Sequence, residues 1–199
     1  FFKNKRVIDQ EIKEEIKDIS YTIFPVIYIS ILFTHIIFLK NISSNDIYFL
    51  NYKFEEGRLW VLAVFLLSFT YDSSAFIVGK LFGKRKLLPK VSPKKSIAGF
   101  IGGMVSTIML TFVLRNYIFN FISLFETFII GLCSGLLAQL GDLGASLFKR
   151  QFHVKDTSQI LPGHGGLLDR CDSVLFVAPF IYYYVRFFIE KKKKKEVFS

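Results

Sequence analysis

A polar segment at residues 141–173 carries the side chains best suited to chemistry in this chain. It reads GDLGASLFKRQFHVKDTSQILPGHGGLLDRCDS and lies between two runs rich in Phe, Ile, Leu and Val. Four Asp, two Lys, two Arg and two His fall within it. Ionisable residues at membrane depth cost roughly 2.5–3.5 kcal/mol each on insertion scales, so such a cluster indicates a functional site. Because it holds both signs of charge, it suits a metal ion bound together with a phosphate.

The start of this segment places three complementary groups on one face if the preceding helix continues past Gly141. Asp142, Ser146 and Lys149 then fall at i, i+4 and i+7, which is one face of an α-helix. That face would carry an anion, a hydroxyl and a cation in a stripe extending out of the membrane. Further charges of both signs follow at Arg150, Lys155 and Asp156.

The end of the segment combines a glycine-rich turn with a pair of carboxylates. Three glycines surround His164 in the turn LPGHGG at 161–166, and they allow backbone N–H groups to point into a common space. Asp169 and Asp172 are neighbours at i and i+3 on a helix. They would repel each other unless Arg170, a lysine or a divalent metal lay between them. In phosphoryl-transfer sites, Mg²⁺ is usually bound by only one or two carboxylates, and phosphates and water complete its coordination.

Other reaction classes fit this segment less well. It has no Ser-His-Asp set with a nucleophile elbow, no P-loop of the form GxxxxGK[ST] and no HExxH. His153 and His164 are eleven residues apart and have no Cys partner at metal spacing, so they are weak support for zinc.

The elements that must position this segment are membrane helices. The 199 residues are 52% apolar and include 24 Phe, with a mean hydropathy of +0.42. Several runs approach the roughly 20 apolar residues that span a bilayer, so we predict an all-α, polytopic integral membrane protein with about five transmembrane helices. The net charge of +10 could suggest nucleic acid, but basic cytoplasmic loops and anionic headgroups explain it better in a membrane protein. We therefore expect membrane lipids, and no nucleic acid, as partners.

Five predicted spans divide the chain. They cover about 20–39, 59–78, 97–114, 121–140 and 174–189. An amphipathic helix at 1–18 precedes them. We expect residues 1–58 to form an N-terminal segment with the first span and a polar loop, and residues 59–199 to form the membrane-embedded catalytic domain. Because the first residue is Phe rather than Met, we also expect a processed or incomplete copy of a longer chain.

Three features inside the spans carry expectations of their own. Asp72 lies in the second span among Ser and Thr residues, which favours a position facing a polar cavity over one at the water interface. His35 in the first span is expected to be packed or hydrogen-bonded rather than a ligand. Gly99 and Gly103 are four residues apart, the small-xxx-small spacing that lets helices approach closely.

A loop at 79–96 carries seven Lys or Arg residues and no acid, so the positive-inside rule places it in the cytoplasm. Gly79, Gly83 and the SPKK turn at 92–95 add close backbone approach beside paired ammonium groups, which suits phosphate. Two further spans bring the polar segment to the same side. The fifth span would then leave the lysines at 191–195 outside, against the rule, so either this span is interrupted or the tail is tolerated outside.

The order of the motifs along the chain is itself informative. The downstream set is SLFKR at 146–150, Lys155-Asp156, LPGHGG at 161–166 and DRCDS at 169–173. The upstream set is Asp72, Gly79, FGK at 82–84, Leu88-Pro89 and SPKKS at 92–96. Together they closely resemble the signature of phosphatidate cytidylyltransferases, also called CDP-diacylglycerol synthases. The resemblance covers roughly the C-terminal two-thirds of the chain.

This resemblance implies a reaction in which a phosphate oxygen of phosphatidate attacks the α-phosphorus of CTP, giving CDP-diacylglycerol and pyrophosphate with Mg²⁺ required. The metal ligands that it implies are Asp142, Asp169 and Asp172, with Asp72 and Asp156 as further candidates. The catalytic residues are Asp142, Asp169, Asp172, Lys149 and Lys155. The residues that hold substrate are Lys94, Lys95, Ser146, Arg150, Arg170, and His164 with Gly165 and Gly166.

We expect the active site on the cytoplasmic side of a bacterial-type inner membrane. A second, monovalent cation beside Mg²⁺ and a homodimer both stay open. Many members of the family carry Glu at the positions of Ala98 and Ala145, so a direct metal role for either glutamate does not apply here.

Two other functions stay open from the sequence. A CTP-dependent lipid kinase would share the nucleotide and the membrane but transfer the γ-phosphate. A transporter or channel would line an ion path with Asp72, Glu126 and the polar segment. The acids concentrate in one segment rich in Lys and Gly, which favours the nucleotidyltransferase.

Overall fold

The structure is a computed structural model that describes residues 33–43, 46–49, 52–89, 92–151 and 168–197, with a few single residues between 19 and 30. Within these ranges the side chains of residues 49, 93, 148, 149, 151, 168–170 and 194–197 are not described. The predicted amphipathic helix at 1–18 and most of the first predicted span therefore lie outside the described residues. The division of the chain at residue 58 stays a prediction.

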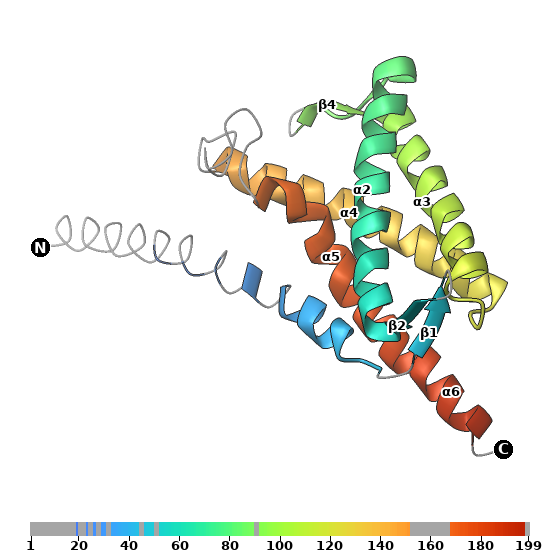
Figure 1. Ribbon diagram of the computed structural model, residues 1–199. Helices are drawn as coiled ribbons and strands as arrows, with labels where there is room; N and C mark the ends of the chain where they lie inside the picture. Colours follow the sequence, from blue (N-terminus) through green and yellow to red (C-terminus); the bar gives the residue numbers. More distant parts are fainter. Residues whose placement is uncertain are drawn as a thin grey trace, which may run out of the picture.

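Long helices form the framework (Figure 1). They are α2 (Glu56–Phe82), α3 (Ile97–Tyr117), α4 (Leu124–Gln151) and α5 (Leu168–Tyr184). The chain continues from α5 through the π-helical segment η1 (Val185–Ile189) into α6 (Glu190–Val197). Helices α2 and α3 lie side by side, and α4 and α5 pack together across them.

Four helical stretches in the described part of the chain are long and apolar enough to cross a membrane. They are Glu56–Phe82, Ile97–Tyr117, Leu124–Leu147 and Cys171–Lys193. These correspond to the last four predicted spans, and they confirm the prediction of a polytopic helical membrane protein. Each helix extends beyond its predicted span because the flanking polar residues continue the helix outside the apolar run.

Two short antiparallel hairpins lie in segments that we predicted as loops. Strand β1 (Asp46–Phe49) pairs with β2 (Tyr52–Glu55), and β3 (Lys86–Leu88) pairs with β4 (Ser92–Ser96). In the first hairpin, Lys53 Nζ lies 2.8 Å from Asp46 Oδ2, and the hydrogen bond to this carboxylate raises the pKa of the Lys53 ammonium. In the second, β4 leads directly into α3 and thereby fixes where the SPKKS motif lies.

Glycines bring the helix backbones close together. A Cβ atom at Gly99 would lie 2.5 Å from the carbonyl oxygen of Ala75, and one at Gly103 would lie 2.6 Å from the ring of Tyr71. Both distances are shorter than any real Cβ contact, so only glycine permits this crossing of α2 and α3. The predicted role of Gly99 and Gly103 in helix packing is confirmed.

An anchor cluster of Ser43, Glu56, Trp60 and Lys193 holds the N-terminal end of α2. Glu56 is fully buried and accepts hydrogen bonds from Ser43 Oγ at 3.0 Å and from Trp60 Nε1 at 3.2 Å. Lys193 Nζ lies 2.6 and 2.7 Å from its two carboxylate oxygens. Every oxygen of the Glu56 side chain therefore has donors, and the lysine neutralises its charge.

The anchor cluster explains the lysine tail at 191–195. The last span is continuous through η1, so these lysines lie at the end of α2 opposite to the basic loop. Lys193 pairs with Glu56, and Lys192 Nζ lies 3.7 Å from Glu126 Oε2. Glu126 also forms a capping box with Ser123 at the start of α4. Two tail charges are thus neutralised locally, and the span need not be interrupted.

His35 belongs to the helical stretch 33–40, which packs on α5. Its side chain is buried, and its Nε2 lies 3.3 Å from the hydroxyl of Tyr183. The prediction that this histidine is packed and hydrogen-bonded is confirmed.

Candidate active site

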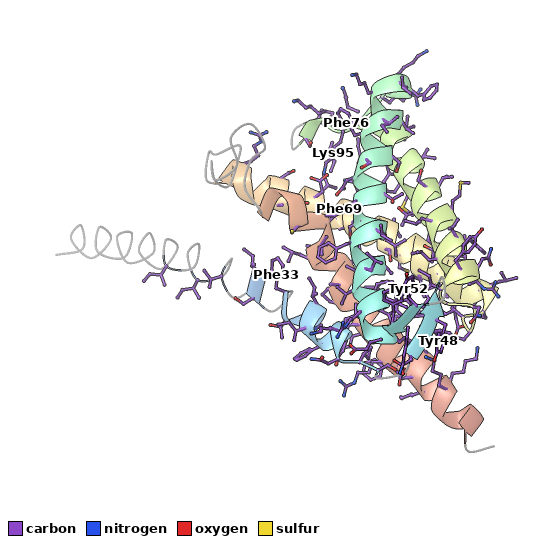
Figure 2. All side chains as sticks on the ribbon, viewed as in Figure 1. Phe33, Tyr48, Tyr52, Phe69, Phe76 and Lys95 are labelled. Carbon is purple, nitrogen blue, oxygen red and sulfur yellow. The ribbon has the colours of Figure 1, made fainter. Side chains whose placement is uncertain are left out.

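A hollow of about 1070 Å³ lies among α2, the β3–β4 hairpin, the start of α3, α4 and α5. Charged side chains of both signs line it: Asp72, Asp142, Asp172, Lys80, Lys86, Lys94 and Lys95. In Figure 2, Lys95 lies level with the part of α2 between Phe69 and Phe76, whereas Tyr48 and Tyr52 lie at the other end of that helix. Asp72 is sixteen residues beyond Glu56, about 24 Å along the helix axis. The hollow therefore lies toward one end of the bundle and the anchor cluster toward the other.

Three helices each contribute one aspartate to the hollow. Asp72 comes from α2, Asp142 from α4 and Asp172 from α5. The hydroxyl of Ser173 lies 3.0 Å from both carboxylate oxygens of Asp72 and 3.5 Å from Asp172 Oδ1. The backbone N–H of Ser173 also donates to Asp172 Oδ1 at 2.8 Å. Ser173 therefore links two of the three carboxylates, and the prediction that Asp72 faces a polar cavity is confirmed.

The crossing of α4 and α5 depends on Gly141. A Cβ atom at this position would overlap the carbonyl oxygen of Asp172. Because glycine allows this approach, Asp142 on α4 and Asp172 on α5 face the same hollow. Helix α4 also continues past Gly141 to Gln151, which confirms the condition on which the predicted stripe of polar groups rested.

Lys94, Lys95 and the N-terminal end of α3 face the aspartates, and we call them the cationic wall. Lys95 Nζ lies 2.5 Å from Asp142 Oδ2, and its side chain is 18% exposed. Lys94 and Lys95 immediately precede Ser96, whose hydroxyl accepts from the N–H of Gly99 and caps α3. The positive end of the α3 dipole and two ammonium groups therefore meet at one place, an arrangement that favours bound phosphate.

Glycines of α2 make room for this wall. A Cβ atom at Gly83 would lie 2.6 Å from Ser96 Oγ and 2.8 Å from Ser96 Cβ. A Cβ atom at Gly79 would lie 3.0 Å from the same Ser96 Oγ. The β4 strand and the cap of α3 thus press directly on the last turns of α2, which sets Lys95 opposite Asp142.

Tyr71 and Gln139 line the hollow beside the aspartates. The Tyr71 hydroxyl donates to Gln139 Oε1 at 2.7 Å, and both side chains are buried. The Nε2 atom of Gln139 is buried and has no hydrogen-bond partner among the residues that the structure describes. Such an amide N–H₂ group suits an acceptor oxygen of a bound molecule.

Sequence reasoning missed several residues that line this hollow: Tyr71, Lys80, Lys86 and Gln139. It also missed the role of Ser173, which is buried and bonds to Asp72. Gln139 could have been found, because it precedes Asp142 by three residues in an otherwise apolar run and so shares its helix face. Ser173 was part of the DRCDS motif but had no assigned role. Lys80 and Lys86 were seen only as part of the basic loop.

The remaining predicted site residues fall into two groups. Ser146 and Arg150 lie one and two turns beyond Asp142 on α4, and neither lines the hollow; Arg150 is exposed. The others lie outside the described residues, some with only their helical backbone placed: Lys149, Lys155, Asp156, His164, Gly165, Gly166, Asp169 and Arg170. Their predicted roles stay predictions.

The donor atoms of the hollow fit Mg²⁺ only if a bound substrate supplies part of its coordination. Its ligands would be carboxylate oxygens, which Mg²⁺ prefers, with phosphate oxygens and water completing the coordination. Within the described ranges, no three His, Cys, Asp or Glu side chains are grouped closely enough to hold a metal ion. The hollow therefore suits a metal that arrives with a phosphate-bearing substrate rather than one held by protein alone.

Several known proteins that resemble this chain carry the same name. The chain is 38% identical to the phosphatidate cytidylyltransferase of Bacillus subtilis (strain 168) over 171 residues, which are 86% of this chain and 60% of that protein. It is 38% identical to the protein of that name from Staphylococcus saprophyticus over 126 residues, 63% of this chain and 48% of the relative. For Staphylococcus aureus (strain COL) the identity is 36% over the same shares.

The chain thus spans between about half and 60% of the length of these relatives. The sequence model of the cytidylyltransferase family matches residues 3–188, which is nearly the whole chain. The match includes all the helices that line the hollow and both motif sets. The chain belongs to the cytidylyltransferase family.

Proposed function

We propose that this protein transfers CMP from CTP to phosphatidate, giving CDP-diacylglycerol and pyrophosphate. The observation that carries the proposal is the hollow in which three aspartates from three membrane helices face four lysines. The name shared by the bacterial relatives supports the choice of substrates. The charges suit a metal–triphosphate complex on one side and a lipid phosphate on the other.

The lipid substrate would approach along α2. Phe69, Ser73, Phe76 and Lys80 all line the hollow and fall at i, i+4, i+7 and i+11, on one stripe of this helix. Phe69 is 47% exposed and Phe76 is 70% exposed. Exposed phenylalanines on a membrane span face acyl chains, so the tails of phosphatidate would lie along them. Its phosphate would then reach the lysines at the end of the stripe.

The nucleotide would bind at the cationic wall. Lys94, Lys95 and the start of α3 would hold the triphosphate, and the amide of Gln139 would donate to one of its oxygens. Lys95 now pairs with Asp142, and it is placed to exchange that carboxylate for a phosphate oxygen when CTP enters. These groups orient the α-phosphorus toward the lipid phosphate.

In the chemical step, a phosphate oxygen of phosphatidate forms a bond to the α-phosphorus of CTP. The bond between that phosphorus and the oxygen bridging to the β-phosphorus breaks, and pyrophosphate leaves with the electron pair. Lysines stabilise the charge that develops on the leaving group. No proton transfer from carbon or to a nucleophilic side chain is required, so the lack of a Ser-His-Asp set is consistent with this reaction.

Magnesium is part of the proposal. Asp72, Asp142 and Asp172 would each offer a carboxylate to a Mg²⁺ ion that enters with the triphosphate, and the predicted ligands Asp169 and Asp156 would add to them. When bound, the ion would neutralise phosphate charge and stabilise the charge on the leaving pyrophosphate. Ser173 would hold Asp72 through its hydroxyl and Asp172 through its backbone N–H.

We place the active site on the cytoplasmic side of a bacterial inner membrane. The hollow lies at the end of the bundle that carries the basic segment 79–96, and the positive-inside rule puts such a segment in the cytoplasm.

A labelled-nucleotide assay of the full chain tests the proposed reaction. Purified protein would be mixed with phosphatidate, Mg²⁺ and CTP carrying ³²P at either the α or the γ position. We expect α-label in the lipid and γ-label in free pyrophosphate. Label from the γ position in the lipid would show a lipid kinase, and an unlabelled lipid in both reactions would overturn the proposal.

An ion path is less compatible with the interior. Between the hollow and the anchor cluster the described side chains of α2 that face inward are mostly apolar: Ala63, Val64 and Leu67. Glu126, which the transporter hypothesis placed on the path, lies at the far end in a capping box. Ion flux into liposomes without CTP would revive that hypothesis.

A further inference from the structure

A second hollow, of about 460 Å³, lies at the end of the bundle that holds the anchor cluster. It is formed between the helical stretch 33–40 with the residues after it and the continuous helix of α5, η1 and α6. Its polar lining consists of Asn41, Tyr182, Arg186, Glu190 and Lys191, and Phe38, Ile42 and Phe187 supply apolar lining. We call it the Arg186 groove. Nothing in the proposed reaction uses it.

The cations of the Arg186 groove are held by aromatic rings rather than by acids. Arg186 donates to the hydroxyl of Tyr182, and its Cζ lies 5.7 Å from that ring. Lys191 Nζ lies 5.5 Å from the ring of Phe187. In the described part of the chain neither cation forms an ion pair, and the nearby Glu190 lies 3.9 Å from Lys193 Nζ. Two cations and the carboxylate of Glu190 therefore line the groove, and the cations have donors to spare.

The π-helical segment sets the direction of Arg186. In η1 the backbone bonds run from i to i+5, which widens the helix by one residue over a single turn. Val185 and Ile189 are buried against the bundle, while Arg186 and Phe187 are exposed toward the groove and its rim. Such π segments occur frequently at functional sites.

The groove lies at the level along the bundle where lipid headgroups are expected. Lys191 is nineteen residues beyond Asp172 on one continuous helix, or about 28 Å, close to the thickness of a bilayer core. Exposed Tyr48 and Tyr52 lie at the same end (Figure 2), and tyrosine concentrates at the membrane–water interface. Phe38 and Phe187 are 48% and 46% exposed, as expected of side chains facing acyl tails.

We propose that the Arg186 groove binds the phosphate of an anionic phospholipid from the leaflet opposite to the active site. Arg186, Lys191 and Asn41 would donate to the phosphate oxygens, and the acyl chains would follow Phe38 and Phe187. The bound lipid would tie the stretch 33–40 to the last span. This site is independent of the proposed reaction, so either proposal can fail without the other.

Native mass spectrometry of the full chain in detergent, after addition of phosphatidylglycerol or phosphatidylcholine, tests the proposal. We expect the wild type to retain phosphatidylglycerol in preference. Because a basic residue near a lipid surface contributes roughly a fivefold factor, Arg186→Gln with Lys191→Gln should lower retention at least about tenfold. Lys191→Gln alone removes an exposed side chain without threat to folding and should lower it by about fivefold.

The matched control is Lys53→Gln with Arg58→Gln, which removes the same charge at the same end but outside the groove. It should retain lipid like the wild type. Millimolar inorganic phosphate should not displace the lipid, because it lacks the acyl chains. Equal losses in the groove and control variants, unchanged retention in Lys191→Gln, or displacement by phosphate would each overturn the proposal.

Discussion

The two ends of this bundle both place a lysine against a carboxylate, but they do so differently. At the anchor cluster, Glu56 is fully buried and receives Ser43, Trp60 and Lys193, so its bonding capacity is filled. At the hollow, Lys95 pairs with Asp142 beside two further aspartates, and both partners are partly exposed, at 18% and 31% of their side chains. The Glu56–Lys193 pair has no bonding capacity left, so we call its end of the bundle the closed end. The Lys95–Asp142 pair is accessible to a ligand, so we call its end the open end.

The surroundings explain the difference. A buried carboxylate without donors costs several kcal/mol, so a structural site must satisfy every oxygen. The hollow instead has three acids in its lining and leaves the amide N–H₂ of Gln139 without a partner among the described residues. In the proposed function, substrate and metal would supply the missing partners of these polar groups. Whether the hydrogen-bonding groups of a buried charge are all satisfied therefore distinguishes a structural site from a ligand site better than the degree of burial does.

The largest effect is expected from Asp142→Asn, which removes one charge from the open end. We predict a loss of activity of about a thousandfold, because a metal–phosphate complex loses a ligand worth several kcal/mol. The transfer assay with labelled CTP measures it. Glu126→Gln at the anchor end is the control and should keep activity within about threefold. Similar losses in both variants would mean that the two ends are not functionally distinct.

Breaking the closed end should affect stability instead. Lys193→Met leaves Glu56 buried without its cation, and we expect about 3 kcal/mol less unfolding free energy in detergent. Lys53→Met removes an exposed lysine and should change stability by less than about 0.5 kcal/mol. Lys193→Met combined with Glu56→Met should recover much of the loss. If Lys193→Met lowered activity without lowering stability, the structural role that we assign to the anchor cluster would be contradicted.

The geometry that joins α4 to α5 can be tested with two neighbouring glycines. Gly141→Ala places a methyl group against the backbone of Asp172, and overpacking of this kind costs about 1–3 kcal/mol. We expect lower stability and lower activity, because Asp142 and Asp172 must separate. Gly144→Ala is the matched control, since its Cβ would lie 3.9 Å from Phe176 and meet no clash. Equal behaviour of the two variants would contradict the close crossing.

The smallest effect is expected from Ser173→Ala, which removes the hydroxyl between Asp72 and Asp172. A hydrogen bond of this kind contributes about 1–1.5 kcal/mol, so we predict about a fivefold to tenfold higher Mg²⁺ concentration for half-maximal activity. Saturating Mg²⁺ should restore most of the rate. Ser74→Ala serves as control, because Ser74 bonds only to backbone carbonyls of its own helix. A rate loss that Mg²⁺ cannot restore would assign Ser173 another role.

Much of the framework could be predicted from the sequence, because apolar runs of sufficient length identify membrane helices directly. The position of Asp72 was also predictable, since a carboxylate among Ser and Thr in such a run requires a polar surrounding. The pairing of Glu56 with Lys193 was not, because the two residues are 137 positions apart and each has ordinary polar neighbours. Only the folded chain shows that the tail lysine neutralises this acid.

The hollow was predicted in part for a related reason. The aspartates stand out against apolar sequence, and the motifs name them. Lys80 and Lys86 do not stand out, because lysines beside a span are expected from topology alone. The hairpin of β3 and β4 that places Lys94 and Lys95 arises from contacts with glycines of α2, which a pattern of charges does not reveal.

The central claim is that three helices build one site for a metal–nucleotide complex, and Mg²⁺-dependent binding of CTP tests it most directly. Calorimetric titration of the full chain in detergent would compare the wild type with Asp72→Asn, Asp142→Asn and Asp172→Asn. We predict binding by the wild type only when Mg²⁺ is present, and at least about tenfold weaker binding in each variant. Binding of CTP without metal, or unchanged affinity in any two of the variants, would contradict the claim.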